Sequence, residues 1–255
     1  MFVKICGVTN EEDALLAVAL GADCIGFNFV AGSIRRITPA EAEAIARRLP
    51  HGTVTVGVFK NESPDTIVSI VTQAGLSGAQ LHGREPVSEV RWIRKRLPFV
   101  VQAFSAEDPH LASAGNSPAD IILVDSATPG AGHVFDWRLA SNAPSGVRLM
   151  IAGGLNPDNI TEAITQLRPY GVDVATGVES TPGKKDAKKM QKFIALAKAS
   201  GYPKDNSGRG EEGGDSDARS HAETQRTFSD DHQHSSYADS TVSHSAIYDW
   251  MDDGQ

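Results

Sequence analysis

The chain has 255 residues, 40% hydrophobic and 22% charged, so it is long enough to bury one substantial core. Its formal charge of −8 comes from 201–255, which carry 4 Lys+Arg against 12 Asp+Glu, whereas the first 200 residues hold 20 of each sign. A neutral main body excludes nucleic acid or an anionic membrane as the main partner, and no apolar run approaches the ~18 residues that a membrane span requires.

Strand-like and helix-like stretches alternate from the start of the chain, as expected of βα units on a parallel sheet. The apolar runs predict strands near 2–7, 23–29, 53–59, 78–82, 99–104, 120–125, 148–153 and 171–176. The intervening patterns predict helices at 11–20, 39–48, 64–74, 87–97, 158–167 and 186–199, with two short ones near 107–114 and 136–141. Eight such units in about 200 residues predict a (β/α)₈ barrel. A doubly wound open sheet is the alternative, but no strand is followed by a G-x-G-x-x-G turn.

The chain therefore divides into an α/β barrel domain at 1–200 and an acidic tail at 201–255. We expect the tail to be disordered, because Gly, Ser, Asp and His with few aliphatic residues bury too little surface to offset ordering entropy. The segment Asp231-His232-Gln233-His234 is interpreted as solvated rather than as a metal site, so no metal is expected. Aromatic and acidic residues at 247–251 suggest a short docking motif whose partner the sequence does not identify.

The first strand ends on a cysteine. In Phe2-Val3-Lys4-Ile5-Cys6-Gly7, period-two alternation puts Lys4 and Cys6 on one face, and the charge of Lys4 would favour a thiolate. A reactive group at the carboxyl end of a barrel strand indicates catalysis, although Cys6 is also interpretable as a small buried hydrophobic residue. Cys24 begins its strand and is expected to be such a residue. Two cysteines are too few for a disulfide framework, and no signal-peptide pattern precedes Cys6. Together these observations predict that the protein is located in the cytoplasm.

Two later strands contribute carboxylates. The sixth strand closes on Asp125, so Cys6 and Asp125 are expected to approach a substrate from different sides of the barrel, a geometry for acid–base chemistry. In the eighth strand, alternation turns Asp173 inward between small residues. An inward carboxylate needs a partner, either a hydroxyl of a bound ligand or an ion pair with Lys4.

The loops after the strands offer further binding groups. Gly153 and Gly154 follow the seventh strand, and Thr176 and Gly177 follow the eighth, where barrel loops commonly bind phosphate through backbone N–H groups. In the loop after strand two, Arg35, favoured over Arg36, is positioned to hold a carboxylate in a bidentate grip. His82 closes the fourth strand and is either a ligand-binding group or a packed loop histidine.

With these residues in place, the chain resembles the phosphoribosylanthranilate isomerases of tryptophan biosynthesis over residues 2–199. Any one segment is weak evidence, but they recur in order on matching strands. The matching segments are Lys4-Ile5-Cys6-Gly7, Asp13-Ala14, Gly26-Phe27, Ser33 with Arg35, Val56-Gly57-Val58-Phe59, Gln80-Leu81-His82-Gly83, Val124-Asp125, Phe135-Asp136-Trp137, Ala152-Gly153-Gly154-Leu155-Asn156-Pro157 and Gly177-Val178-Glu179-Ser180.

The resemblance implies a cofactor-free Amadori rearrangement of N-(5-phosphoribosyl)anthranilate to 1-(2-carboxyphenylamino)-1-deoxyribulose 5-phosphate. It implies that Asp125 is the general acid, which requires a raised pKa, and that Cys6 is the general base, which requires a lowered one. It further implies that Arg35 binds the anthranilate carboxylate and Asp173 a sugar hydroxyl. The backbone around Gly153, Gly154, Thr176 and Gly177 would bind the phosphate.

Three positions depart from the family pattern. Ile34 replaces a usual proline and is expected to loosen the loop of Arg35; Gln102 replaces a frequent lysine, removing a charge near the mouth; and Ala131 stands where a hydroxyl residue is usual. Two alternatives to the isomerase remain: the related histidine-pathway aminoaldose isomerase, which has a carboxylate where Cys6 stands, and a catalytically silent barrel acting as an interaction module. The expected partner is a small phosphorylated substrate, and the expected assembly is a monomer or homodimer.

Overall fold

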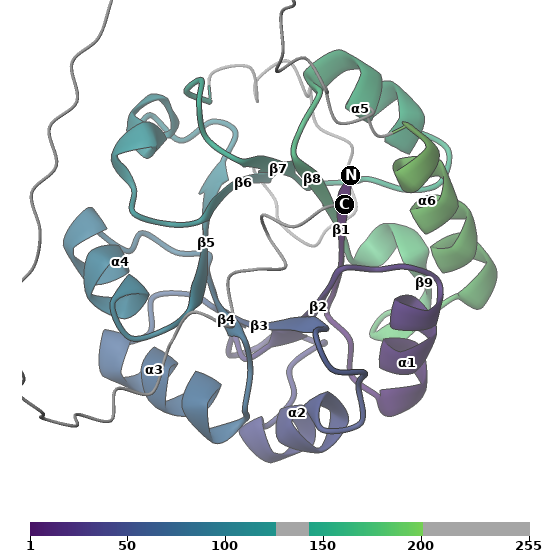
Figure 1. Cartoon of the computed structure of the whole chain (residues 1–255), viewed down its shortest axis with the longest axis horizontal. Coiled ribbons are helices and arrows are strands. Elements are labelled where there is room, and N and C mark those ends of the chain that lie inside the picture. Colours follow the sequence, from purple (N-terminus) through teal and green to yellow (C-terminus); the bar gives the residue numbers. More distant parts are fainter. Residues whose placement is uncertain (126–142, 201–255) are drawn as a thin grey trace, which may run out of the picture. The chain divides into compact units, whose positions relative to one another are not determined.

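The computed structural model describes residues 1–125 and 143–200. Eight parallel strands close into a barrel in sequential order, with the α-helices outside it (Figure 1). The strands are β1 (Phe2–Cys6), β2 (Cys24–Asn28), β3 (Val54–Phe59), β4 (Gly78–Leu81), β5 (Phe99–Ser105), β6 (Ile121–Asp125), β7 (Leu149–Ile151) and β8 (Gly171–Val174). The predicted (β/α)₈ barrel is confirmed, and the open sheet is excluded because β1 pairs with both β2 and β8.

The helices begin where the sequence places capping residues. They are α1 (Glu11–Ala19), α2 (Pro39–Ala46), α3 (Pro64–Gln73), α4 (Val87–Arg94), α5 (Ile160–Leu167) and α6 (Ala187–Ser200). Asn10 accepts a hydrogen bond from the N–H of Asp13, Thr38 forms a capping box with Glu41, and Ser63 caps α3. These side chains satisfy N–H groups that the first helical turn leaves without partners.

Four predicted helices differ from the structure by more than one residue. Two of them end early: α2 ends at Ala46 instead of 48, and α4 ends at Arg94 instead of 97. The region predicted at 107–114 forms a 3₁₀ helix, η1 (Leu111–Asn116), instead of an α-helix. The predicted start at 158 is wrong, because 157–159 form a turn and α5 begins only at Ile160. The side chain of Asn159 accepts from the N–H of Asn156, which holds this turn. The helix predicted at 136–141 and the tail at 201–255 lie outside the described residues, so the domain boundary at 200 stays a prediction.

The core has two layers, set by the alternation along each strand. Val3 and Ile5 of β1, and Val172 and Val174 of β8, face outward into the apolar layer between barrel and helices, and all four are buried. Lys4 and Asp173 therefore face inward, and the two residues are neighbours in the β1–β8 pairing. Burying the outward apolar side chains stabilises the barrel by roughly 25 cal/mol per Å² of apolar surface.

The region after β8 contains elements that the strand prediction did not include. A short 3₁₀ helix, η3 (Thr176–Val178), leads into an antiparallel hairpin made of β9 (Glu179–Thr181) and β10 (Lys184–Lys185). Pro182 and Gly183 form its turn, and Gly183 has a φ of +84°, which favours glycine. This hairpin precedes α6 in the chain and becomes important below.

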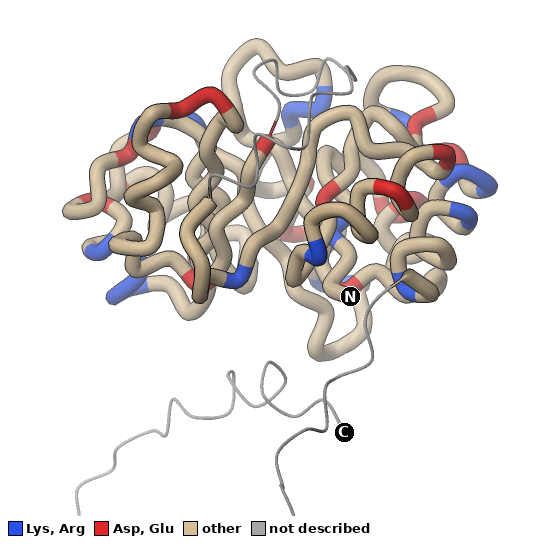
Figure 2. The backbone as a smooth tube through the Cα atoms, turned by 90° about the horizontal axis from the view of Figure 1, so that it is seen from above, with Lys and Arg blue, Asp and Glu red and all other residues tan. Residues whose placement is uncertain are grey.

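Charges of both signs are interspersed over the described barrel (Figure 2), in keeping with the even balance of the first 200 residues. Within the described ranges, no helix is long and apolar enough to cross a membrane.

Candidate active site

A cavity of about 570 Å³ lies at the carboxyl ends of the barrel strands. It brings together every residue that the sequence analysis predicted for the site. These are Cys6, Arg35, His82, Asp125, Gly153, Gly154, Asp173, Thr176 and Gly177. Because strand ends far apart in the sequence meet around one opening, groups from β1, β4, β6 and β8 can act on a single ligand.

A buried ion pair between Lys4 and Asp173 lies beside Cys6. Lys4 is fully buried, and its Nζ donates to both carboxylate oxygens of Asp173 at 3.0 Å. Burial is the largest single effect and lowers the pKa of Lys4, but Asp173, Cys6 and Cys24 together outweigh it, so the pKa of Lys4 is raised above its ordinary value. Of the two partners left open by the sequence for Asp173, the structure shows the ion pair. Asp173 also lines the cavity, where a ligand can contact it.

The Cys6 thiol and the Lys4 ammonium gather over Gly26. A Cβ at that position would lie 3.0 Å from Cys6 Sγ and 3.1 Å from Lys4 Nζ, so a larger residue there would crowd both groups. Burial raises the pKa of the Cys6 thiol, and Lys4 lowers it by less than burial raises it. The expected lowering of the Cys6 pKa is therefore wrong for this structure, since the sequence shows the neighbouring charge but not the loss of solvent.

Cys24 is fully buried, and its Sγ lies 3.9 Å from the carbonyl oxygen of Ile25. Burial raises the pKa of this thiol as well. Unlike Cys6, it does not line the described cavity. This agrees with its interpretation as a small packed residue.

The side chains of His82 and Asp125 lie close together in the lining of the cavity. His82 Nε2 lies 3.5 Å from Asp125 Oδ2, and His82 Nδ1 lies 3.1 Å from Gln80 Nε2. Burial, with repulsion from Lys4 and Lys60, lowers the pKa of His82 to about 4, so the imidazole is neutral at pH 7. Within the described ranges, His82 Nε2 and Gln80 Oε1 are buried polar atoms without a hydrogen-bond partner.

The low pKa of His82 predicts a specific loss of stability in mild acid. An unfolded histidine titrates near pH 6.5, so between pH 6.5 and about 4 the unfolded chain binds a proton that the folded chain does not. Stability is therefore fully present above pH 6.5 and falls as the pH falls, by about 2 kcal/mol between pH 7 and pH 5 from this group. Urea unfolding at the two pH values measures the loss.

The matched variants for this measurement are His82→Gln and His51→Gln. His51 is exposed and serves as the control. We expect His82→Gln to lose most of the pH-dependent difference and His51→Gln to retain it. Equal pH dependence in the two variants would contradict a buried neutral imidazole at His82.

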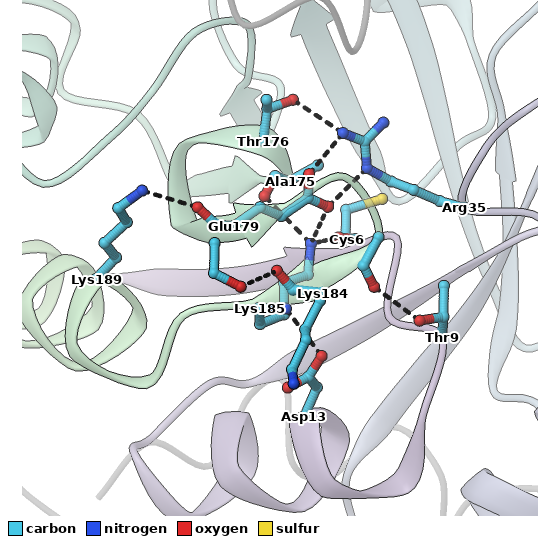
Figure 3. Close-up of polar contacts among 12 residues, drawn as sticks. Cys6, Thr9, Asp13, Arg35, Ala175, Thr176, Glu179, Lys184, Lys185 and Lys189 are labelled. Carbon is cyan, nitrogen blue, oxygen red and sulfur yellow. Dashed lines mark hydrogen bonds and ion pairs between the residues drawn. The ribbon is translucent and has the colours of Figure 1, made fainter.

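Arg35 is held by a residue that the sequence analysis did not single out. Arg35 Nε and Nη2 each donate to the Glu179 carboxylate at 2.7 Å, and Nη2 also lies 3.4 Å from Thr176 Oγ1 (Figure 3). These bonds raise the pKa of Arg35, which stays charged. A ligand carboxylate therefore cannot use the Nε–Nη2 edge, and the expected bidentate grip must use the edge that carries Nη1.

The two glycine-containing loops lie side by side. Gly153 and Gly154 have φ values of +87° and +67°, which favour glycine, and the side chains of Asn156 and Asn159 donate to the Gly154 carbonyl and hold that turn. Gly177 packs so closely against the backbone of the first loop that a Cβ would overlap it. Both loops thus present backbone to the same end of the cavity.

The departures from the family pattern have different outcomes. Gln102 is buried, donates to the Glu85 carbonyl and accepts from Ser117, and it does not line the described cavity. Its predicted place near the mouth is wrong, because its side chain binds neighbouring loops. The Ile34 side chain is 66% exposed at the cavity, and the looseness expected there stays a prediction. Ala131 lies outside the described residues.

Comparisons with known proteins agree with this geometry. The family model of N-(5'-phosphoribosyl)anthranilate (PRA) isomerase matches residues 3–196. The N-(5'-phosphoribosyl)anthranilate isomerase of Desulforudis audaxviator is 45% identical over 200 residues, which cover 77% of this chain and 97% of that protein.

Solved structures show the same likeness. The phosphoribosyl anthranilate isomerase of Thermus thermophilus aligns with a TM-score of 0.74 and 40% identity, over 78% of this chain and 99% of that one. A PRA isomerase in complex with reduced 1-(o-carboxyphenylamino)-1-deoxyribulose 5-phosphate aligns with a TM-score of 0.69, 38% identity and the same coverage. The dimeric enzyme of Thermotoga maritima, solved as monomers, aligns with a TM-score of 0.69, 39% identity and the same coverage. The chain therefore belongs to the N-(5'-phosphoribosyl)anthranilate isomerases, the isomerases of tryptophan biosynthesis.

Proposed function

We propose that Asp125 and Cys6 catalyse the Amadori rearrangement of N-(5-phosphoribosyl)anthranilate in this chain, as general acid and general base. The observation that carries the proposal is their position: both line one cavity, and they come from strand ends on different sides of the barrel. A group that donates a proton and one that removes a proton can thus reach different atoms of one substrate.

The first step opens the sugar ring. Asp125 gives its proton to the furanose oxygen, the bond between C1 and that oxygen breaks, and the anthranilate nitrogen supplies the electron pair for a Schiff base. His82 Nε2, 3.5 Å from Asp125 Oδ2, faces the carboxylate that this step leaves behind. A neutral imidazole there does not add a second charge to the site.

The second step removes the proton from C2. Cys6, as thiolate, takes that proton, and the C2 electron pair forms the enolamine, which tautomerises to the ketone. Because burial raises the Cys6 pKa, the thiol must lose its proton before it acts, and Lys4 stabilises the resulting thiolate. The Lys4–Asp173 pair keeps that positive charge in place.

The remaining cavity residues hold the substrate. Arg35 would bind the anthranilate carboxylate, Asp173 a sugar hydroxyl through the lone pairs that Lys4 leaves, and His82 a nearby polar atom. Backbone N–H groups around Gly153, Gly154, Thr176 and Gly177 would bind the phosphate, since two glycine-containing loops allow close approach.

The activity test uses anthranilate fluorescence. Substrate generated in place should lose its fluorescence faster with the enzyme than without it. Turnover of the histidine-pathway aminoaldose in its place, with no turnover of phosphoribosylanthranilate, would overturn the proposal. A barrel inactive on both would support the silent interaction module.

The carboxylate role of Arg35 predicts a loss of binding. Arg35→Met should weaken binding of reduced 1-(o-carboxyphenylamino)-1-deoxyribulose 5-phosphate by about 10- to 100-fold, the range for hydrogen bonds to a charged group. Arg36→Met is the matched control, because Arg36 is exposed and does not line the described cavity. Fluorescence titration measures both variants, and equal affinity would remove Arg35 from the binding site.

Assembly and location stay proposals. The chain is expected to act in the cytoplasm as a monomer or homodimer on a small phosphorylated substrate.

A further inference from the structure

Three charged side chains form a buried network beside the cavity (Figure 3). Glu179 Oε1 accepts from Arg35 Nε at 2.7 Å and from Lys185 Nζ at 3.1 Å, and its Oε2 accepts from Arg35 Nη2 at 2.7 Å. The three side chains are at most 10% exposed. Two cations thus share one carboxylate, and the cation nearer the cavity is the one assigned to the substrate carboxylate.

The network also contacts the backbone that carries the proposed base. Lys185 Nζ donates to the carbonyl oxygen of Cys6 at 2.6 Å and to that of Ala175 at 3.2 Å. The N–H of Lys185 donates to Asp13 Oδ2 at 2.9 Å, and Thr9 Oγ1 donates to the Gly183 carbonyl at 2.8 Å. The β9–β10 hairpin is therefore fastened to the β1–α1 loop, and Glu179 is fixed relative to the end of β1.

The stability of the fold does not by itself explain this buried network of charges. Desolvating three charges offsets much of their mutual attraction, and well-packed apolar residues often serve a core as well or better. The network has one consequence that apolar residues would not give: Glu179 occupies the Nε–Nη2 edge of the guanidinium. The plane of the guanidinium is then set, and its Nη1 edge is the one available to an anion.

We propose that Glu179 is a positioning residue for substrate recognition, which fixes the orientation of Arg35 and its distance from the Cys6 strand end. The inference rests on the proposed function, in which Arg35 binds the anthranilate carboxylate. Glu179 itself makes no contact with the substrate in this account. Its effect on binding must therefore pass through Arg35.

The test is a double-mutant cycle with Glu179→Gln, Arg35→Met and the double variant, using the reduced product analogue as the probe. Glu179→Gln should weaken analogue binding about tenfold, on the order of one charged hydrogen bond. In the Arg35→Met background the same change should cost less than about twofold, because the group that Glu179 orients is gone. In turnover, Glu179→Gln should raise KM about tenfold and change kcat less than about threefold.

The variant is expected to fold. Burial lowers the pKa of Lys185 even with Glu179 present, so without the carboxylate the amine can lose its proton instead of remaining as a buried charge. Glu179→Asp is the second variant. It keeps the charge but is one methylene too short to make all three bonds, and it should weaken binding in the same direction by about threefold.

Asp120→Asn is the matched control for loss of a carboxylate. Asp120 accepts from Arg94 Nη2 at 2.9 Å and from the N–H of Val100 at 2.8 Å, just before β6 begins and outside the cavity lining. It should lower Tm and leave analogue binding unchanged. This control separates lost stability from lost positioning.

The outcomes distinguish the inference from the proposed function. If Arg35→Met does not weaken analogue binding, the role of Arg35 in the proposed function fails. If Arg35→Met weakens binding but Glu179→Gln costs the same in both backgrounds, or nothing in the wild type, the positioning role of Glu179 is overturned. Weakening that is present only when Arg35 is present supports it.

Discussion

Replacing Cys6 with serine is expected to lower kcat by about 10²- to 10⁴-fold, the range that a positioned general base contributes. The hydroxyl fits the same space, but it ionises at far higher pH than a thiol, so Lys4 cannot supply enough stabilisation to make it a base. Binding of the reduced product analogue should change less than about threefold, because the thiol acts on C2 and does not hold the substrate. Fluorescence decay measures kcat and titration measures binding.

Cys24→Ser is the matched control, since it makes the same atomic change at the other thiol. Cys24 pairs with Lys4 in the β1–β2 register and is buried, but it does not line the described cavity. It should retain kcat within about threefold. Full activity in Cys6→Ser, or equal loss in both variants, would exclude Cys6 as the specific base.

The pH profile gives a second readout on the same residue. Because the pKa of Cys6 is raised, the fraction of thiolate in the free enzyme grows toward alkaline pH, and iodoacetamide should alkylate Cys6 faster as the pH rises. The sequence suggested the opposite shift from Lys4 alone. The burial of Cys6 arises only when the barrel closes. The residues next to Cys6 in the sequence therefore do not show how far burial raises its pKa.

The fold was predictable because each local signal agreed with the others. Alternation in β1 and β8 correctly placed Val3 and Val172 outward and Lys4 and Asp173 inward. The predictions failed where local signals compete. Asn156-Pro157 resembles a helix start, but its side-chain and backbone groups form a turn, so α5 starts at Ile160.

The site was predictable only as far as residues mark strand ends. Cys6, Asp125 and the glycines close their strands and line the cavity. Glu179 and Lys185 lie beyond the last barrel strand, and their partner Arg35 lies 144 positions from Glu179 in the chain. Pro182-Gly183 is a turn signal that indicates the hairpin, but the sequence does not show that the hairpin folds against the loop after β2.

Replacing Asp125 with asparagine is expected to lower kcat by about 10²- to 10⁴-fold, because an amide has no proton to give to the furanose oxygen. The amide keeps the shape and the acceptor oxygen of the carboxylate, so contacts with His82 are retained in part. Analogue binding should therefore change less than about threefold. A large loss of kcat with retained binding identifies a group whose interaction matters only in the transition state.

Asp120→Asn serves again as the control, because it makes the same change next to the opposite end of β6. It should retain kcat within about threefold while lowering stability, since Asp120 accepts hydrogen bonds from Arg94 and from the N–H of Val100 in β5. If kcat falls in both Asp125→Asn and Asp120→Asn, the loss comes from a destabilised β6 and not from the missing acid. If kcat falls in Asp125→Asn but not in Asp120→Asn, the general acid is Asp125. If kcat also falls in Cys6→Ser but not in Cys24→Ser, the general base is Cys6, and both groups stand at strand ends that the cavity brings together.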